Sequence, residues 1–206
     1  MHNNIAGALA ELGRKVGFYV SREPTHHQRP ISQGCSPTDE GWQEHADLLL
    51  VKDDRKLYVD VCVTRPTTGA NQEKLPGAAW QPLISTRKRV HEKHSKYDEI
   101  AELNGYEPIA FVCETYGGFC REARQLLRTL ASYAPPEMGG EKEFLTHAYR
   151  TLSVCLQRGN ASLDQGAVHR LHTEDVRHDA RVMAKAKYRQ RQTDRSRLEL
   201  AADTAA

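Results

Sequence analysis

Residues 45–64 read HADLLLVKDDRKLYVDVCVT, and this segment gives the clearest indication of the architecture. Its two apolar runs, residues 46–51 and 56–64, are rich in the branched and aromatic residues typical of β-strands. Asp53 and Asp54 lie between the runs and favour a tight turn. We therefore predict two strands that are close enough to form a hairpin.

Helices and further strands flank this hairpin on both sides. Apolar spacing predicts helices over residues 3–15, 82–103, 119–133 and 141–158, and strands over 16–20 and 107–115. Stretches rich in Gly and Pro predict loops over 22–45 and 65–81. The order α-β-β-β-α-β-α predicts an α/β fold with one mixed sheet between helices. We expect a core domain at residues 1–134 and a helical, basic C-terminal extension at 141–200.

Composition limits the class of protein. The chain has 206 residues, of which 39% are hydrophobic and 27% charged, so it can form an ordinary globular core. No apolar run approaches a membrane span, and the first 15 residues lack the pattern of a secretory signal. Five cysteines at scattered spacings favour free thiols in a reducing compartment inside the cell.

Basic residues are concentrated in two segments, although the formal net charge is only +2. Residues 87–96 and 177–197 contain many more Lys and Arg than Asp and Glu, which favours a polyanionic partner. Two solvated helix faces are the alternative. The candidate phosphate contacts are Arg87, Lys88, Arg177, Arg181, Lys185, Lys187, Arg189 and Arg191.

Two aspartates lie in the strands of the hairpin. Asp47 is near the start of the first strand and Asp60 is inside the second, so antiparallel pairing can bring both carboxylates to one end of the sheet. A carboxylate within an apolar strand is costly unless a cation or hydrogen-bond donors compensate its charge. Oxygen ligands favour Mg²⁺ or Mn²⁺. In the alternative interpretation, Asp47 caps a strand end and Asp60 pairs with an arginine.

The helix over 82–103 carries a basic cluster that could reach these acids. Lys93, Lys96 and Tyr97 share one helical face in the sequence HEKHSKY. A lysine beside a metal can hold a scissile phosphate or activate a water molecule, and Tyr97 could orient that lysine. A solvated lysine-rich turn is the alternative.

This combination of acids, lysines and element order resembles the PD-(D/E)XK nucleases, whose common core is α-β-β-β-α-β. More narrowly, it resembles the restriction-like endonuclease domain of site-specific non-LTR retrotransposons. That domain has an aspartate, a second acid about a dozen residues later, and a displaced lysine in a Lys-x-x-Lys-Tyr-like helix. Asp47, Asp60 and residues 93–97 (KHSKY) match this pattern, and the resemblance covers about residues 2–160.

The resemblance implies a Mg²⁺- or Mn²⁺-dependent endonuclease that nicks DNA and leaves a 3′-hydroxyl. It also implies a nuclear location and a reverse transcriptase region in a longer polyprotein as a partner. Asp47 and Asp60 would bind the metal, and Glu11 or Glu23 are candidates for a further acid. Lys96 is the preferred catalytic lysine because it directly precedes Tyr97. Lys93 is the alternative, or an auxiliary phosphate contact.

Two residues depart from the family pattern. Ala46 replaces a proline, and Cys62 replaces the lysine that usually follows two residues after the second acid. A neutral thiol cannot supply the missing positive charge, so activity would need a lysine from the helix. The alternatives are a catalytically inactive nuclease-fold module that binds DNA or acts as a scaffold, and a helical interaction protein acting through residues 141–200.

Overall fold

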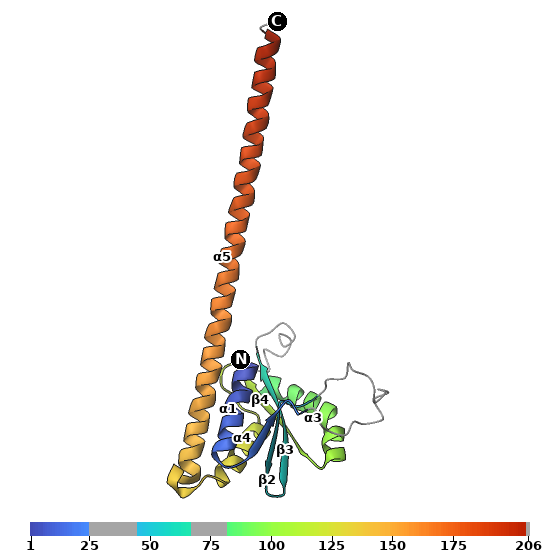
Figure 1. The fold of residues 1–206 in the computed structure, drawn as a ribbon, viewed down its shortest axis with the longest axis vertical. Coiled ribbons are helices and arrows are strands. Elements are labelled where there is room, and N and C mark those ends of the chain that lie inside the picture. The colour runs from blue at the N-terminus through green and yellow to red at the C-terminus, as the bar shows by residue number, and fades with distance from the viewer. Residues whose placement is uncertain (25–44, 67–81, 205–206) are drawn as a thin grey trace. The chain divides into compact units, whose positions relative to one another are not determined.

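The computed structural model describes residues 1–24, 45–66 and 82–204 (Figure 1). The predicted order of elements is confirmed, and the loops predicted over 22–45 and 65–81 lie almost entirely outside the described residues. The elements are α1 (His2–Lys15), β1 (Tyr19–Arg22), β2 (Leu48–Lys52), β3 (Arg55–Thr64), α3 (Ile84–Asn104), β4 (Glu107–Glu114), α4 (Arg121–Ser132), the 3₁₀ helix η3 (Pro136–Met138) and α5 (Gly140–Thr204).

The four strands form one mixed sheet in the order β1-β2-β3-β4, as the α/β prediction required. β1, β2 and β3 are antiparallel neighbours, and the turn at residues 53–54 joins β2 to β3. β4 lies parallel to β3, and α3 makes the crossover between them. A parallel pair needs such a crossover, so α3 is held close to β3 by the topology itself.

Alternation along β3 sends its side chains to two different faces of the sheet. Leu57, Val59 and Val61 belong to the main hydrophobic core. Tyr58 and Asp60 point to the opposite face, where Tyr58 packs against residues of α3.

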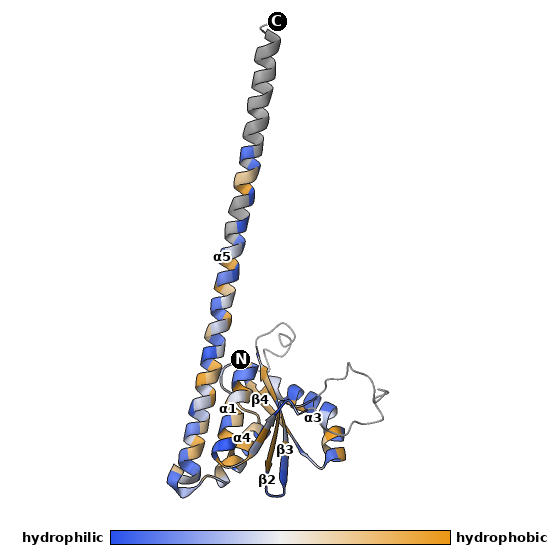
Figure 2. Ribbon diagram, viewed as in Figure 1, coloured by the Kyte–Doolittle hydropathy of each residue, from blue (hydrophilic) through white to orange (hydrophobic). Residues whose placement is uncertain are grey.

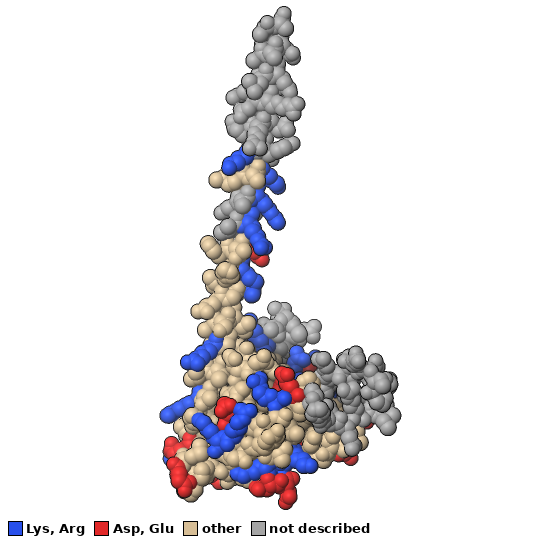
Figure 3. Space-filling model, in the orientation of Figure 1, with Lys and Arg blue, Asp and Glu red and all other residues tan. Residues whose placement is uncertain are grey.

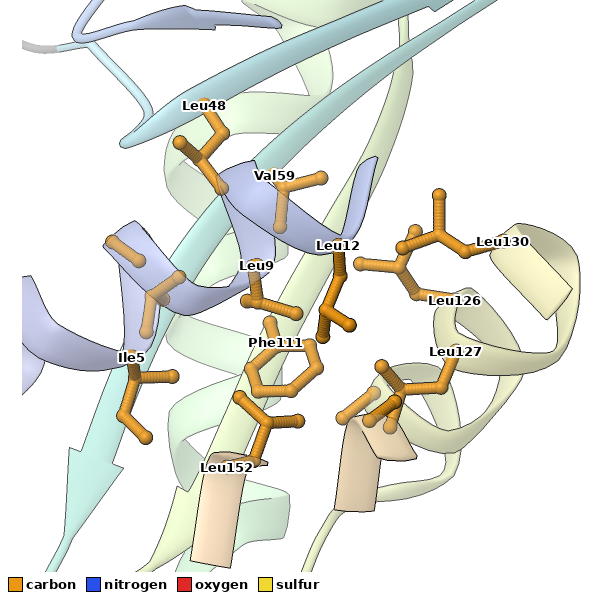
Figure 4. Packing of buried hydrophobic residues seen from close by; sticks show 14 of the residues in the cluster. Ile5, Leu9, Leu12, Leu48, Val59, Phe111, Leu126, Leu127, Leu130 and Leu152 are labelled. Carbon is orange, nitrogen blue, oxygen red and sulfur yellow. The ribbon is translucent and has the colours of Figure 1, made fainter. Parts of the chain in front are cut away.

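The main core lies between the sheet and the helices α1, α4 and the beginning of α5. α1 presents an apolar stripe toward the sheet, and α4 is strongly amphipathic, so both bury one face. Phe111 of β4 is fully buried at the centre of this core (Figure 4). Around it lie Ile5, Leu9, Leu12, Val59, Leu126, Leu127 and Leu152.

The opposite face of the sheet is covered by α3, and its buried cluster is smaller. The cluster contains Ala46, Tyr58, Tyr97, Ile100 and Ala101. Most of α3 is polar, so only a narrow part of the helix is available to pack against the sheet. α3 ends at Gly105, whose φ of 64° is the left-handed conformation expected of a glycine that terminates a helix.

One strand begins later than predicted. The expected strand over 16–20 is replaced by β1 at Tyr19–Arg22. Gly17 has a φ of 84°, which turns the chain directly after α1. Val16 and Phe18 are consequently directed into the core rather than into a strand. The apolar pattern of this segment reflects burial at a helix end, which strand spacing alone does not distinguish.

α5 is a helix of 65 residues that belongs to two compact units, Met1–Asn160 and Ala161–Ala206. In the first unit, Phe144, Ala148, Leu152 and Leu156 of α5 are part of the main core. The predicted separation between residues 134 and 141 therefore does not coincide with the division at Asn160. The helix predicted over 141–158 continues as helix through the described part of the second unit.

Hydrophilic and hydrophobic residues alternate along the described part of α5 (Figure 2). No helix among the described residues is long and apolar enough to span a lipid bilayer. Cys62, Cys113, Cys120 and Cys155 are free thiols, as predicted, and Cys35 lies outside the described residues.

Candidate active site

The structure brings Asp47 and Asp60 to the same end of the β2–β3 hairpin. The last paired residues at this end are Leu48 and Val59, so one further step of the antiparallel register sets Asp47 opposite Asp60. The backbone N–H of Val61 donates a hydrogen bond of 2.6 Å to Oδ2 of Asp47. The carboxylate of Asp47 is thereby fixed directly beside the residue that follows Asp60.

Asp60 is buried on the α3 face of the sheet, with 6% of its surface exposed. Burial raises the pKa of its carboxyl group, and the neighbouring Lys93 opposes this rise. Nζ of Lys93 lies 2.7 Å from Oδ2 of Asp60. This oxygen is fully buried, and apart from the ion pair it accepts no hydrogen bond of regular geometry from the described residues. The ion pair therefore carries most of the compensation for a costly buried charge.

Tyr97 sets the rotation of α3 against the sheet. Its ring is 5% exposed and packs edge-on against Tyr58 with 5.9 Å between centroids. Its hydroxyl donates a hydrogen bond of 3.3 Å to the carbonyl oxygen of His45. Burial raises the pKa of this phenol, so it keeps its proton and acts as a donor.

The lysine that meets Asp60 is Lys93, which was the alternative in the sequence analysis. Lys93 lies one helical turn before Tyr97, and this places its side chain over β3. Lys96, the preferred residue, has its Nζ 5.1 Å from the centre of the Tyr97 ring. Lys93 lies 5.7 Å from the same ring, so the ion pair with Asp60 is what distinguishes Lys93.

His2 joins this site and was not identified from the sequence. Its Nε2 lies 3.0 Å from Oδ2 of Asp47 and 3.0 Å from the carbonyl oxygen of Val61. The hydrogen bond to Asp47 raises the pKa of the imidazole to about 9. The only available signal was helical spacing, because His2 continues the apolar face formed by Ile5 and Leu9.

Cys62 lies two residues after Asp60 on β3, so both side chains point toward α3. Burial raises the pKa of its thiol, which keeps the sulfur neutral. Residue 62, where the nucleases named above usually have a lysine, therefore carries no charge. Lys93 supplies the cation from the facing helix instead.

The donor groups suit a magnesium ion. Mg²⁺ is usually held by one or two carboxylates, with water and substrate phosphate completing its shell. Asp47 and Asp60 provide two such carboxylates, and Oδ2 of Asp60 is a buried oxygen whose described partner is the ammonium group of Lys93. No group of three or more His, Cys, Asp or Glu side chains in the described residues forms a metal site. Asp47 and Asp60 therefore offer two carboxylates, and water and substrate phosphate would have to complete the shell of a bound ion.

The structure does not bring the other predicted acids to this site. Glu11 is exposed and pairs with Arg14 at 2.5 Å. It lies nine residues after His2 on α1, a separation of roughly 13 Å along the helix axis. Glu23 is exposed after β1, where its backbone N–H donates to the carbonyl oxygen of Asp47. Neither carboxylate has a hydrogen bond or ion pair with Asp47 or Asp60 in the described residues. From α1 it is His2 that reaches Asp47.

The predicted phosphate contacts fall in different parts of the chain. Arg87 and Lys88 are exposed on α3, where Lys88 pairs with Glu92 at 3.7 Å. In the second unit, Lys and Arg side chains lie along the described part of the helix (Figure 3). The exposed members are Arg177, Arg181, Lys185 and Lys187, and the side chains of Arg189 and Arg191 lie outside the described part.

Comparison with known proteins did not identify a family for the chain. No protein-family model matches the chain, and no curated protein matches it. Asp47, Asp60 and Lys93 are therefore the residues from which a function can be inferred.

Proposed function

We propose that the protein is a metal-dependent endonuclease that nicks DNA, built on a core of the PD-(D/E)XK type. The observation that carries the proposal is the ion pair between Lys93 and the buried Asp60, directly beside Asp47. Support for the core comes from the element order and from the positions of the acids at β2 and β3.

The two carboxylates and the lysine have separate roles in this proposal. Asp47 and Asp60 would hold Mg²⁺, or Mn²⁺ in its place. Lys93 offers an ammonium group that can donate to a non-bridging phosphate oxygen and offset the negative charge that develops there. Tyr97 is a positioning residue, because its burial sets the helix turn from which Lys93 extends.

The metal, when bound, would lower the pKa of a water molecule and polarise the phosphodiester. The chain's own contribution is to hold two carboxylates rigidly at a strand pair and to deliver a cation from the facing helix. Because the side chain of Asp60 is only 8% exposed and that of Lys93 26%, substrate would approach from the edge at Asp47, whose side chain is 19% exposed.

Nicking of supercoiled plasmid by the full chain tests the proposal. Wild-type protein should nick in Mg²⁺ or Mn²⁺ and not in EDTA. Asp60→Asn should reduce the rate by about a hundredfold or more, since it removes a carboxylate ligand. Glu107→Gln is the matched control, because Glu107 is an exposed carboxylate on the neighbouring strand, paired with Arg55, and should leave the rate unchanged.

A catalytically inactive module is the second candidate, and one observation favours it. His2 and Lys93 already compensate the two carboxylates without a metal. If wild-type protein binds DNA but does not nick it in either metal, and if titration calorimetry detects no Mn²⁺ binding that Asp60→Asn removes, this second function replaces the first.

A further inference from the structure

A groove lies between the beginning of α3 and the beginning of α4. Its volume is about 600 Å³. Thr86, Arg87 and Val90 line it from α3, and Arg121, Glu122 and Arg124 line it from α4. The groove therefore has a basic residue on each wall.

The three arginines of the groove have uncompensated charge. All three are exposed, and none forms an ion pair with a described residue. Arg89, on the same helix but outside the groove, pairs with Glu92 at 2.7 Å. Arg87, inside the groove, has no such carboxylate partner among the described residues. Guanidinium groups that are free of carboxylates are well suited to phosphate, which they can bind with two parallel hydrogen bonds.

Glu122, the acidic residue that lines the groove, does not offset the positive charge of the three arginines. Glu122 lies 3.0 Å from Nε2 of His94 and accepts a hydrogen bond of 3.0 Å from the backbone N–H of Ala110. Its carboxylate is thus turned toward α3 and β4 and has its own donors. Arg121 and Arg124 also lie in the first turn of α4, where the helix dipole favours anions.

The groove and the candidate active site lie along the same helix, α3. Arg87 of the groove is exposed, and the side chain of Lys93 is 26% exposed. Arg87 and Lys93 are roughly 9 Å apart along the axis, which corresponds to about three nucleotides of a DNA strand at 3.4 Å each. A strand held at Lys93 could therefore continue into the groove.

We propose that this groove binds backbone phosphates of the DNA strand that is cut at the Asp60–Lys93 site. The inference rests on the proposed nuclease function for its choice of DNA. Arg87, Arg121 and Arg124 would contact phosphates a few nucleotides from the scissile bond. Contacts of this kind position a strand without selecting its sequence.

Fluorescence anisotropy with a labelled DNA duplex, the full chain and EDTA tests the groove without cleavage. The variant is Arg121→Ala with Arg124→Ala. Its control is Arg128→Ala with Arg150→Ala, which removes the same charge from exposed positions outside the groove lining. Thermal melts of both variants should match wild type, because all four side chains are exposed.

The groove variant should bind about tenfold more weakly than wild type. Its plot of log affinity against log salt should be less steep by about 2, one for each lost phosphate contact. The control should stay within about twofold and keep the wild-type slope. Equal weakening of both variants, an unchanged groove variant, or stronger binding to an RNA duplex of the same sequence would each overturn the inference.

The nicking assay separates failure of the groove from failure of the nuclease proposal. If Asp60→Asn abolishes nicking while the groove variant binds and nicks like wild type, the groove inference fails and the nuclease proposal stands. If wild type does not nick but binding still depends on the groove arginines, the nuclease proposal fails and the groove remains a DNA-binding surface.

Discussion

The two faces of the sheet differ in the kind of side chains that they bury. On one face, Phe111 and its neighbours are enclosed by α1, α4 and the beginning of α5 in a continuous apolar core. On the other, α3 contributes a small cluster around Tyr97 and then an ion pair to the buried Asp60. The first face can supply stability, while the second accepts a buried charge that costs stability unless it is compensated.

A cavity made on each face of the sheet should reveal the largest difference between them. Ile5→Ala in the main core should lower the free energy of unfolding by about 4 kcal/mol, because it empties part of a continuous, fully packed cluster. Ile100→Ala on the α3 face, equally buried, should cost only about 2 kcal/mol, because the smaller cluster there can relax around the cavity. Urea denaturation measures both, and an equal loss from the two would show that the faces do not differ in this way.

The next largest effect concerns the cation. Lys93→Ala should reduce plasmid nicking by about a hundredfold, because no ammonium then faces Asp60. Adding Cys62→Lys to that variant should restore nicking to within about tenfold of wild type, since residue 62 points toward the same helix from β3.

Lys96→Ala is the control for the lysine assignment and should nick at nearly the wild-type rate. The opposite result, in which Lys96→Ala is inactive and Lys93→Ala active, would return the catalytic role to Lys96.

A smaller effect is expected from the imidazole that joins α1 to Asp47. The pKa of His2 is raised above its ordinary value of 6.5 to about 9, so its pairing stabilises the fold fully below pH 6.5. That contribution decreases as the pH rises through 9. The difference in unfolding free energy between wild type and His2→Gln should therefore be larger at pH 6 than at pH 10, by less than about 1 kcal/mol for so exposed a pair. A difference that grows with pH would contradict the pairing.

The smallest effect is expected at Glu11. Glu11→Gln removes one side of an exposed ion pair with Arg14, which is worth less than about 0.5 kcal/mol. Nicking should be unchanged, because Glu11 lies roughly 13 Å along α1 from His2, the residue of this helix that contacts Asp47. A tenfold loss of nicking with normal stability would instead make Glu11 a metal ligand.

Much of the fold follows from local patterns in the sequence. The hairpin was predictable because two runs rich in Leu, Val and Tyr flank a two-residue turn, and the end of α3 because Asn104 and Gly105 follow it. β1 was misplaced since Val16 and Phe18 are apolar for burial after a helix rather than for a strand. Local spacing cannot separate these two causes.

The candidate site was less predictable because its contacts are tertiary. Asp47 and Asp60 could be paired from hairpin geometry alone. The choice between Lys93 and Lys96 depends on the rotation of α3, which is set by the packing of Tyr97 on Tyr58. His2 meets a partner 45 residues away, and no local pattern encodes that contact.

The ion pair between Lys93 and Asp60 should make α3 and β3 unfold together. Since β3 carries a buried acid and α3 carries its counter-ion, neither element reaches its lowest free energy without the other. If α3 detached, the carboxylate of Asp60 would be left on the sheet without its counter-ion. We expect the backbone amides of α3 and of the middle of β3 to exchange with deuterium in a single concerted opening.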